Sequence, residues 1–141
     1  MASHPPRRLT VIAQRHKMDC GIAALAMLLD VSYERVAILA YALAAKDVPT
    51  AGLTMREVQA IAWQCGSSLD RHRTYELGTA RGILSVRREP TWWHLVMLQR
   101  GVIVDPTGGR VFDATDYLQS QQARACTLLV RGTQEAARVA S

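Results

Sequence analysis

Asparagine is absent from this 141-residue chain, and the absence narrows the catalytic arrangements open to it. In nucleophilic catalysis a histidine base is oriented by a side-chain carboxylate or amide. Any site in this chain that needs asparagine or aspartate for that purpose must therefore use aspartate.

Cysteine is also scarce, with three residues at positions 20, 65 and 126. The number is odd, the spacing is wide and there is no CxxC pair. Disulfide frameworks and structural zinc sites both need closely patterned cysteines. The sequence therefore excludes both, and the resemblance described below implies no metal and no cofactor either.

No apolar run approaches the roughly 18 to 20 residues that cross a bilayer. The N-terminal MASHPPRRLTVIA has neither the apolar region nor the cleavage site of a secretory signal. The 49% hydrophobic and 21% charged residues are typical of a soluble globular domain. We therefore expect a cytoplasmic protein with a loose arm at 1–8, one domain at 9–131 and a weakly ordered tail at 132–141.

The formal charge of +5 raises the hypothesis of nucleic-acid binding. However, the basic residues occur singly or in pairs such as Arg7-Arg8 and Arg87-Arg88, without a long run interleaved with aromatics. Net charge alone bears on solubility and non-specific attraction. Nucleic-acid binding is accordingly the weaker hypothesis.

The hydrophobic period changes once along the chain. Helical spacing predicts a helix that begins at Cys20, a second that is capped by Ser32 and ends near residue 45, and a third that opens on the capping box Thr54-Met55-Arg56-Glu57. A short helix is expected at 114–122. Strands rich in β-branched or aromatic residues are predicted at 82–87, 92–98, 102–105 and 127–131. Helices followed by an antiparallel sheet indicate an α+β domain.

Cys20 stands where the polar run QRHKMD meets the apolar run GIAALAMLL. At the first position of a helix, unpaired amides and the helix dipole favour the thiolate, whereas the neighbouring Asp19, the expected N-cap, opposes it. Position alone therefore leaves Cys20 as either a packed thiol or a nucleophile. Cys65 lies on the apolar stripe of its helix and Cys126 has no polar company, so both are expected to be structural.

A cysteine nucleophile needs a base, and the chain offers four histidines. His4 lies in the arm, His16 in an exposed polar run and His72 among arginines in an expected loop. His94 is embedded in the apolar strand WWHLVML. It is the candidate base if a partner can orient it.

The hairpin register offers that partner. A four-residue loop that ends at Gly101 pairs Met97 with Val102 and sets His94 directly opposite Asp105. A three-residue loop shifts the register by one and places the two side chains on opposite faces. The backbone amide of Cys20 is one candidate oxyanion donor. Gln14, six residues upstream, is another.

Together, Gln14-x5-Cys20 within QRHKMDCG, His94 in an apolar strand and the Asp105-Pro106 pair resemble the bacteriocin-processing cysteine peptidases. These are papain-like domains, usually fused to ABC exporters, that cut leader peptides after a double glycine. The resemblance implies that Cys20 is the nucleophile and His94 the general base and acid. It further implies that Asp105 orients His94 and that Gln14 donates to the oxyanion.

Substrate contact is expected from Asp19, Gly21 and Trp93, which flank the implied nucleophile and base. The resemblance also implies a peptide or protein substrate with a Gly-Gly site and, since no exporter segment follows, a stand-alone domain. A turn explains the chain's own Gly108-Gly109 better than a cleavage site does. Two alternatives stay open: a thiol amidase, isopeptidase or acyl transferase, and a non-catalytic peptide-binding or regulatory module.

Overall fold

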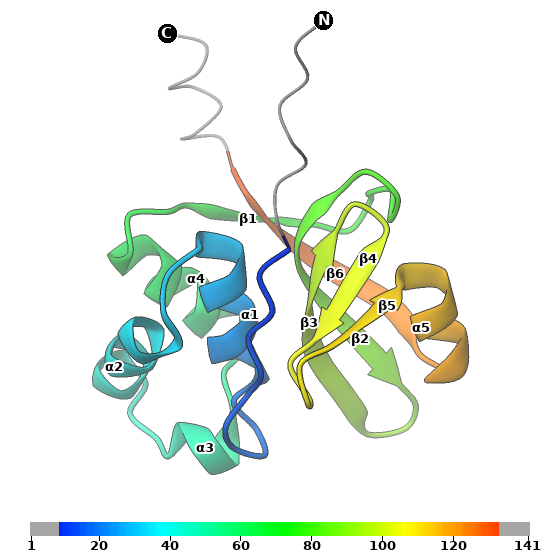
Figure 1. Cartoon of the computed structure of the whole chain (residues 1–141). Coiled ribbons are helices and arrows are strands. Elements are labelled where there is room, and N and C mark those ends of the chain that lie inside the picture. The colour runs from blue at the N-terminus through cyan, green and yellow to red at the C-terminus, as the bar shows by residue number, and fades with distance from the viewer. Residues whose placement is uncertain (1–8, 133–141) are drawn as a thin grey trace, which may run out of the picture.

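The computed structural model describes residues 9–132, in which a helical half lies against a sheet (Figure 1). The expected arm at 1–8 and residues 133–141 of the expected tail lie outside the described residues. The helices are α1 (Cys20–Leu29), α2 (Tyr33–Leu43), α3 (Val48–Ala51), α4 (Met55–Gln64) and α5 (Ala114–Ser120). The strands are β1 (Leu69–His72), β2 (Arg81–Arg88), β3 (Trp92–Gln99), β4 (Val102–Asp105), β5 (Arg110–Asp113) and β6 (Arg124–Arg131). The predicted α+β class is confirmed.

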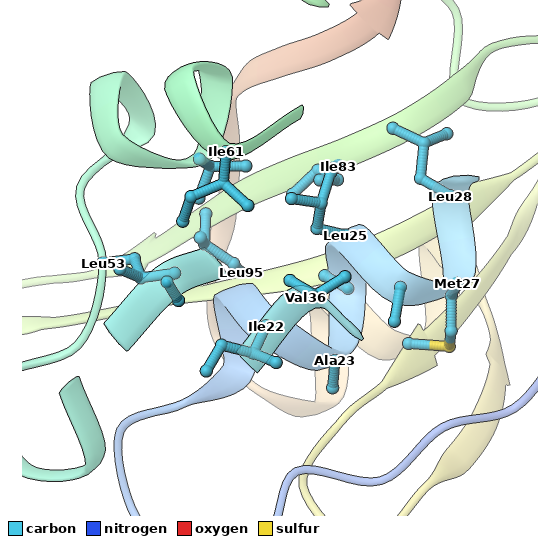
Figure 2. Packing of buried hydrophobic residues seen from close by; sticks show 14 of the residues in the cluster. Ile22, Ala23, Leu25, Met27, Leu28, Val36, Leu53, Ile61, Ile83 and Leu95 are labelled. Atoms are coloured by element: carbon cyan, nitrogen blue, oxygen red, sulfur yellow. The ribbon is translucent and has the colours of Figure 1, made fainter. Parts of the chain in front are cut away.

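Helix α1 is buried around its whole circumference. Residues 21–28 are all buried, whereas a helix at the surface of a domain buries one apolar stripe. Figure 2 shows the reason: side chains of α1 meet Val36 of α2 and Ile61 of α4 as well as Ile83 and Leu95 of the sheet. A helix that is apolar on every side is stable only when it is enclosed in this way. Within residues 9–132, neither α1 nor any other helix has the length and apolar character to cross a membrane.

The six strands form one antiparallel sheet in the order β1-β6-β2-β3-β4-β5. One face carries Ile83 and Leu95 and packs against the helices α1 and α4. The other face carries Val96 and Ile103 and packs against Tyr117 of α5. Figure 1 shows α1 to α4 on one side of the sheet and α5 on the other. The sheet therefore separates two apolar clusters.

Two helix starts follow their sequence signals. The Ser32 side chain accepts a hydrogen bond from the backbone N–H of Arg35 at 3.1 Å. Thr54 Oγ1 accepts from the Glu57 N–H at 3.1 Å, and Glu57 Oε1 accepts from the Thr54 N–H at 2.8 Å. Each bond satisfies a donor that the first turn of a helix leaves unpaired. Both predicted caps are confirmed.

Three elements were not predicted, and each is short. Helix α3 accommodates its proline because a proline in the first turn gives up no intrahelical bond. Strands β1 (LDRH) and β5 (RVFD) lie at the two edges of the sheet and are largely exposed. Edge strands of this kind have no buried face to impose an apolar alternation on the sequence.

The predicted register between β3 and β4 is wrong. The structure pairs Gln99 with Val102, so the connection is a two-residue turn and not a loop of three or four residues. Arg100 and Gly101 have φ values of 46° and 86°, the positive values that a type I′ hairpin turn requires at both positions. The pairing slips by two residues from the four-residue prediction. Because side chains alternate with a period of two, this slip preserves the face on which each residue lies.

Candidate active site

A cleft of about 490 Å³ lies at the N-terminus of α1, and its lining brings together residues that are far apart in the sequence. Half-buried Cys20 contributes from the helix, and His94 and Asp105 contribute from β3 and β4. Trp93, which is 44% exposed, lines the same cleft. The enclosed body of α1 fixes the place of its first residue, so Cys20 faces the sheet from a rigid support.

His94 and Asp105 are in direct contact although the predicted register was wrong. They are diagonal neighbours on one face of the sheet, and His94 Nε2 lies 2.7 Å from Asp105 Oδ1. Each residue is only 9% exposed. Asp105 Oδ1 also accepts the backbone N–H of Thr107 at 2.9 Å, and Oδ2 accepts the hydroxyl of Tyr117 at 2.8 Å. Both carboxylate oxygens are thus held in place.

These contacts determine how the pair is charged. Burial on its own lowers the pKa of His94, but hydrogen bonds with Asp105 and Cys20 outweigh it and raise this pKa from 6.5 to about 9. For Asp105, burial raises the pKa, and the hydrogen bonds from His94, Thr107 and Tyr117 outweigh that effect and lower it. The result is an imidazolium beside a carboxylate at neutral pH. The pair therefore places a proton donor next to Cys20.

Gln14 reaches the same region from the loop before α1. Its backbone N–H donates to the carbonyl of Pro106 at 2.8 Å, and its Oε1 accepts the Thr107 hydroxyl at 3.3 Å. Its Nε2 donates to the carbonyls of His16 and Lys17 at 2.8 and 2.9 Å. In this structure the amide of Gln14 therefore braces the loop that leads to Cys20.

Asp19 does not line the cleft, and its expected contact with substrate is corrected. Its carboxylate is fully buried and accepts the backbone N–H groups of Arg15 and His16 and the hydroxyl of Tyr33. Asp19 occupies the N-cap position of α1, but its side chain does not cap the helix. It holds the preceding loop instead.

Replacing Asp19 with alanine should destabilise the fold by about 2–3 kcal/mol, because three donors lose their buried acceptor. Urea unfolding measures the change. Asp116→Ala, at an exposed position in the first turn of α5, serves as the control. Equal unfolding midpoints for Asp19→Ala and the wild type would contradict the bracing role.

Gly21 is buried as well, so its expected contact with substrate is also corrected. A Cβ on Gly21 would lie 3.3 Å from Leu95 Cδ1 and 3.4 Å from the side chain of Leu53. The glycine thus allows the first turn of α1 to approach β3 closely. Of the three expected substrate contacts, Trp93 is the one that the structure places in the cleft.

Within residues 9–132, the other cysteines and histidines lie outside the cleft lining. Cys65 was expected in the core, but it is the C-cap of α4 and is half-buried. Cys126 is half-buried in β6. His16 is exposed as expected, whereas His72 lies at the end of β1 and not in a loop. His4 lies outside the described residues.

Two functional contacts were missed by the sequence analysis. Thr107 follows the Asp-Pro pair, and its N–H to Asp105 is the kind of local bond that aspartate makes two residues on in a turn. That signal was available in the sequence. Tyr117 lies on α5, and nothing in the sequence indicated that this helix reaches across the sheet to Asp105.

Tyr117→Phe should lower kcat about 5- to 20-fold with little change in KM, because one buried oxygen of Asp105 loses its donor. The phenylalanine ring keeps the edge-on packing against Phe112, whose ring centre lies 5.2 Å away. Steady-state kinetics across pH measures the effect, with Tyr41→Phe at an exposed position of α2 as the control. If the substitution changed the unfolding free energy and left kcat unchanged, Tyr117 would contribute to packing and not to catalysis.

Comparison with protein families matches residues 8–79 to the model of the Peptidase C39 family. This segment contains Gln14 and Cys20 and ends before His94 and Asp105. Comparison with the sequences of curated proteins gives no match.

Among solved structures, the chain is similar to a double-glycine-motif protease from an AMS/PCAT transporter, determined in complex with its leader peptide. The two are 22% identical, with a TM-score of 0.62, and the match covers 87% of this chain and 90% of the other. The similarity therefore extends over the sheet as well as the helices.

Proposed function

The chain belongs to the Peptidase C39 family and is a cysteine peptidase, and from this premise we propose that Cys20, His94 and Asp105 form its catalytic triad. The observation that carries the proposal is the buried His94–Asp105 pair, which lines the same cleft as a cysteine at a helix N-terminus. This is the arrangement of nucleophile, base and orienting group that acyl transfer needs.

The geometry supports distinct roles for the two nitrogens of His94. Nε2 contacts Asp105, which leaves Nδ1 for the thiol of Cys20. The thiolate attacks the scissile carbonyl carbon, and the imidazolium then donates its proton to the leaving amine as the C–N bond breaks. Water, deprotonated by neutral His94, hydrolyses the thioester and restores the thiol. Throughout the cycle Asp105 fixes the tautomer of the ring.

We propose that the backbone N–H of Cys20 and the amide of Gln14 bind the developing oxyanion. For Gln14 this requires one N–H to turn from the Lys17 carbonyl to the substrate. Gln14→Ala should then lower kcat by about 10²-fold, the usual cost of one oxyanion donor. The measurement is kcat beside the unfolding free energy. A loss of stability with kcat preserved would leave Gln14 as a brace for the loop.

The proposed substrate is a peptide cleaved after a double glycine, as in a leader peptide. Two observations support it: the family, and the structural similarity to a protease solved with its leader peptide. Trp92 and Trp93 both line the cleft beside His94. Bulky walls of this kind leave room near the thiol for residues without side chains. The cytoplasmic location and the stand-alone state stay predictions.

Matched fluorogenic peptides test this substrate. A peptide with Gly-Gly before the scissile bond should be cleaved at least about 10-fold faster than one with Ala-Ala at the same positions, because extra methyl groups in a tight subsite each cost about 1 kcal/mol or more. Cys20→Ala provides the blank. If an ester or an isopeptide is hydrolysed and the Gly-Gly peptide is not, the enzyme is a thiol amidase or isopeptidase and the leader-peptide proposal fails.

A further inference from the structure

A second hollow, of about 450 Å³, lies on the sheet and is rich in arginine. Its lining includes Arg73, Arg87 and Arg124 together with Ser85 and Thr127. No acidic side chain among residues 9–132 contributes to that lining. We call this feature the arginine hollow.

Two of the three arginines are not neutralised. Arg124 pairs with Glu89 at 3.1 Å. For Arg73 and Arg87 the described part of the chain supplies no ion pair and no side-chain hydrogen bond. Ser85 Oγ accepts the backbone N–H of Thr127 at 3.1 Å, so its hydroxyl hydrogen is free to donate. A free guanidinium presents five donors in a planar fork that matches carboxylate oxygens.

One cross-strand pair links the lining of the arginine hollow to that of the catalytic cleft. Arg87 of β2 is paired directly opposite Trp93 of β3, so the two side chains stand on the same face about 5 Å apart. Trp93 is a wall of the cleft. On the other side of β2, Arg87 is paired with Arg124 of β6. A chain that leaves the cleft across Trp93 therefore meets Arg87 first.

The order of the strands gives the distance that a bound peptide would cover between Trp93 in the cleft and Arg73 in the arginine hollow. From β3 across β2 and β6 to Arg73, which follows β1, there are three strand spacings. At about 4.8 Å each, they span roughly 14 Å. An extended peptide advances about 3.3 Å per residue, so roughly four residues cover the distance. Positions about three to six residues from the scissile bond would lie over the arginines.

We propose that the arginine hollow binds an acidic segment of the peptide substrate, about three to six residues from the scissile bond. The inference rests on the proposed function of the cleft and adds a substrate class to it. Its role is to hold the substrate by charge-assisted hydrogen bonds from Arg73 and Arg87. The reacting atoms are untouched, so the effect falls on KM more than on kcat.

Four peptides with the same Gly-Gly centre test the proposal. One is neutral, one carries Asp and Glu three to six residues before the scissile bond, one carries them after it, and one carries lysine on both sides. We expect one acidic peptide to have a KM about 10-fold below that of the neutral peptide, which corresponds to about 1.4 kcal/mol of binding. The advantage should shrink as the salt concentration rises.

Charge-reversal variants assign the effect to the hollow. Arg87→Glu and Arg73→Glu should each remove the KM advantage of the acidic peptide relative to the neutral one. Arg35→Glu, which makes the same change at an exposed position of α2, should leave that ratio unchanged. Equal KM values for neutral and acidic peptides in the wild type would overturn the proposal while leaving the proposed function intact.

Two further measurements separate the remaining outcomes. If no peptide is cleaved, the proposed function fails, and the hollow is tested by fluorescence anisotropy with Cys20→Ala: tighter binding of an acidic peptide supports it, and equal binding overturns it. A single-stranded RNA oligonucleotide is the competing polyanion. Binding of RNA that Arg87→Glu abolishes, with no preference among the peptides, would make the hollow a nucleic-acid site and overturn the proposal.

Discussion

Replacing Cys20 with alanine should lower kcat for peptide cleavage by about 10⁴-fold or more while the protein stays folded. Cys20 is half-buried at the first position of α1, and the other residues of that helix up to Leu28 are enclosed without it. Removing one sulfur atom at the end of the helix therefore costs little packing. It removes the sole atom proposed to form the bond with substrate.

The other two cysteines provide matched controls, because both are also half-buried. Cys65→Ala and Cys126→Ala should keep kcat within about 2-fold of the wild type, as substitutions away from the reacting atoms do. Labelling with iodoacetamide near neutral pH gives an independent readout, because Cys20 lines the cleft beside His94 whereas Cys65 and Cys126 lie outside its lining. Preferential labelling of Cys65 or Cys126, with Cys20 inert, would show that the nucleophile is misassigned.

The elements that the sequence predicted are those with a strong local cause. The caps of α2 and α4 depend on Ser32 and Thr54 within a single turn, and the inner strands have a buried face that fixes their pattern. Strand β5 was missed because its pairing with β4 comes from tertiary contacts and its own sequence is mostly exposed. The type I′ turn at Arg100 was missed because arginine seldom adopts a positive φ.

The prediction that His94 and Asp105 meet survived an error in register, because the error was an even number of residues. The two-residue turn shifts the pairing of β3 and β4 by two residues from the four-residue prediction. Side chains alternate between the two faces, so this shift leaves His94 and Asp105 on the same face. A slip of one would have separated them. Asp19 could not be placed in the same way, because its burial depends on Tyr33 in another helix. Likewise, the contact between Tyr117 and Asp105 depends on where α5 packs, which no local pattern encodes.

The pH dependence of kcat/KM should reflect the loss of a proton from the imidazolium of His94. Because the pKa of its imidazolium is raised to about 9, kcat/KM should hold up to that pH and fall above it as the general acid loses its proton. Ordinary histidine, with a pKa near 6.5, would place this fall more than two units lower. The contacts with Asp105 and Cys20 therefore extend the active range towards alkaline pH.

Asp105→Asn should lower kcat by about 10³- to 10⁴-fold and move the alkaline fall to lower pH. A neutral amide cannot stabilise the imidazolium, so the pKa of His94 drops. The amide can also offer its N–H where the carboxylate accepted, which favours the wrong tautomer of the ring. In the other orientation the amide oxygen still accepts the Thr107 N–H, and the Tyr117 hydroxyl can accept from the amide N–H. The fold should therefore tolerate the change.

The control for this prediction is Asp116→Asn, which makes the same chemical change on the exposed first turn of α5. It should change neither kcat nor the pH at which kcat/KM falls on the alkaline side. If Asp105→Asn lowered kcat without shifting the pH at which kcat/KM falls, Asp105 would act only by positioning the ring. If neither quantity changed, His94 would not depend on Asp105, and the buried 2.7 Å contact would be structural. The shift in the pH at which kcat/KM falls therefore separates electrostatic stabilisation of the imidazolium from orientation of the ring alone.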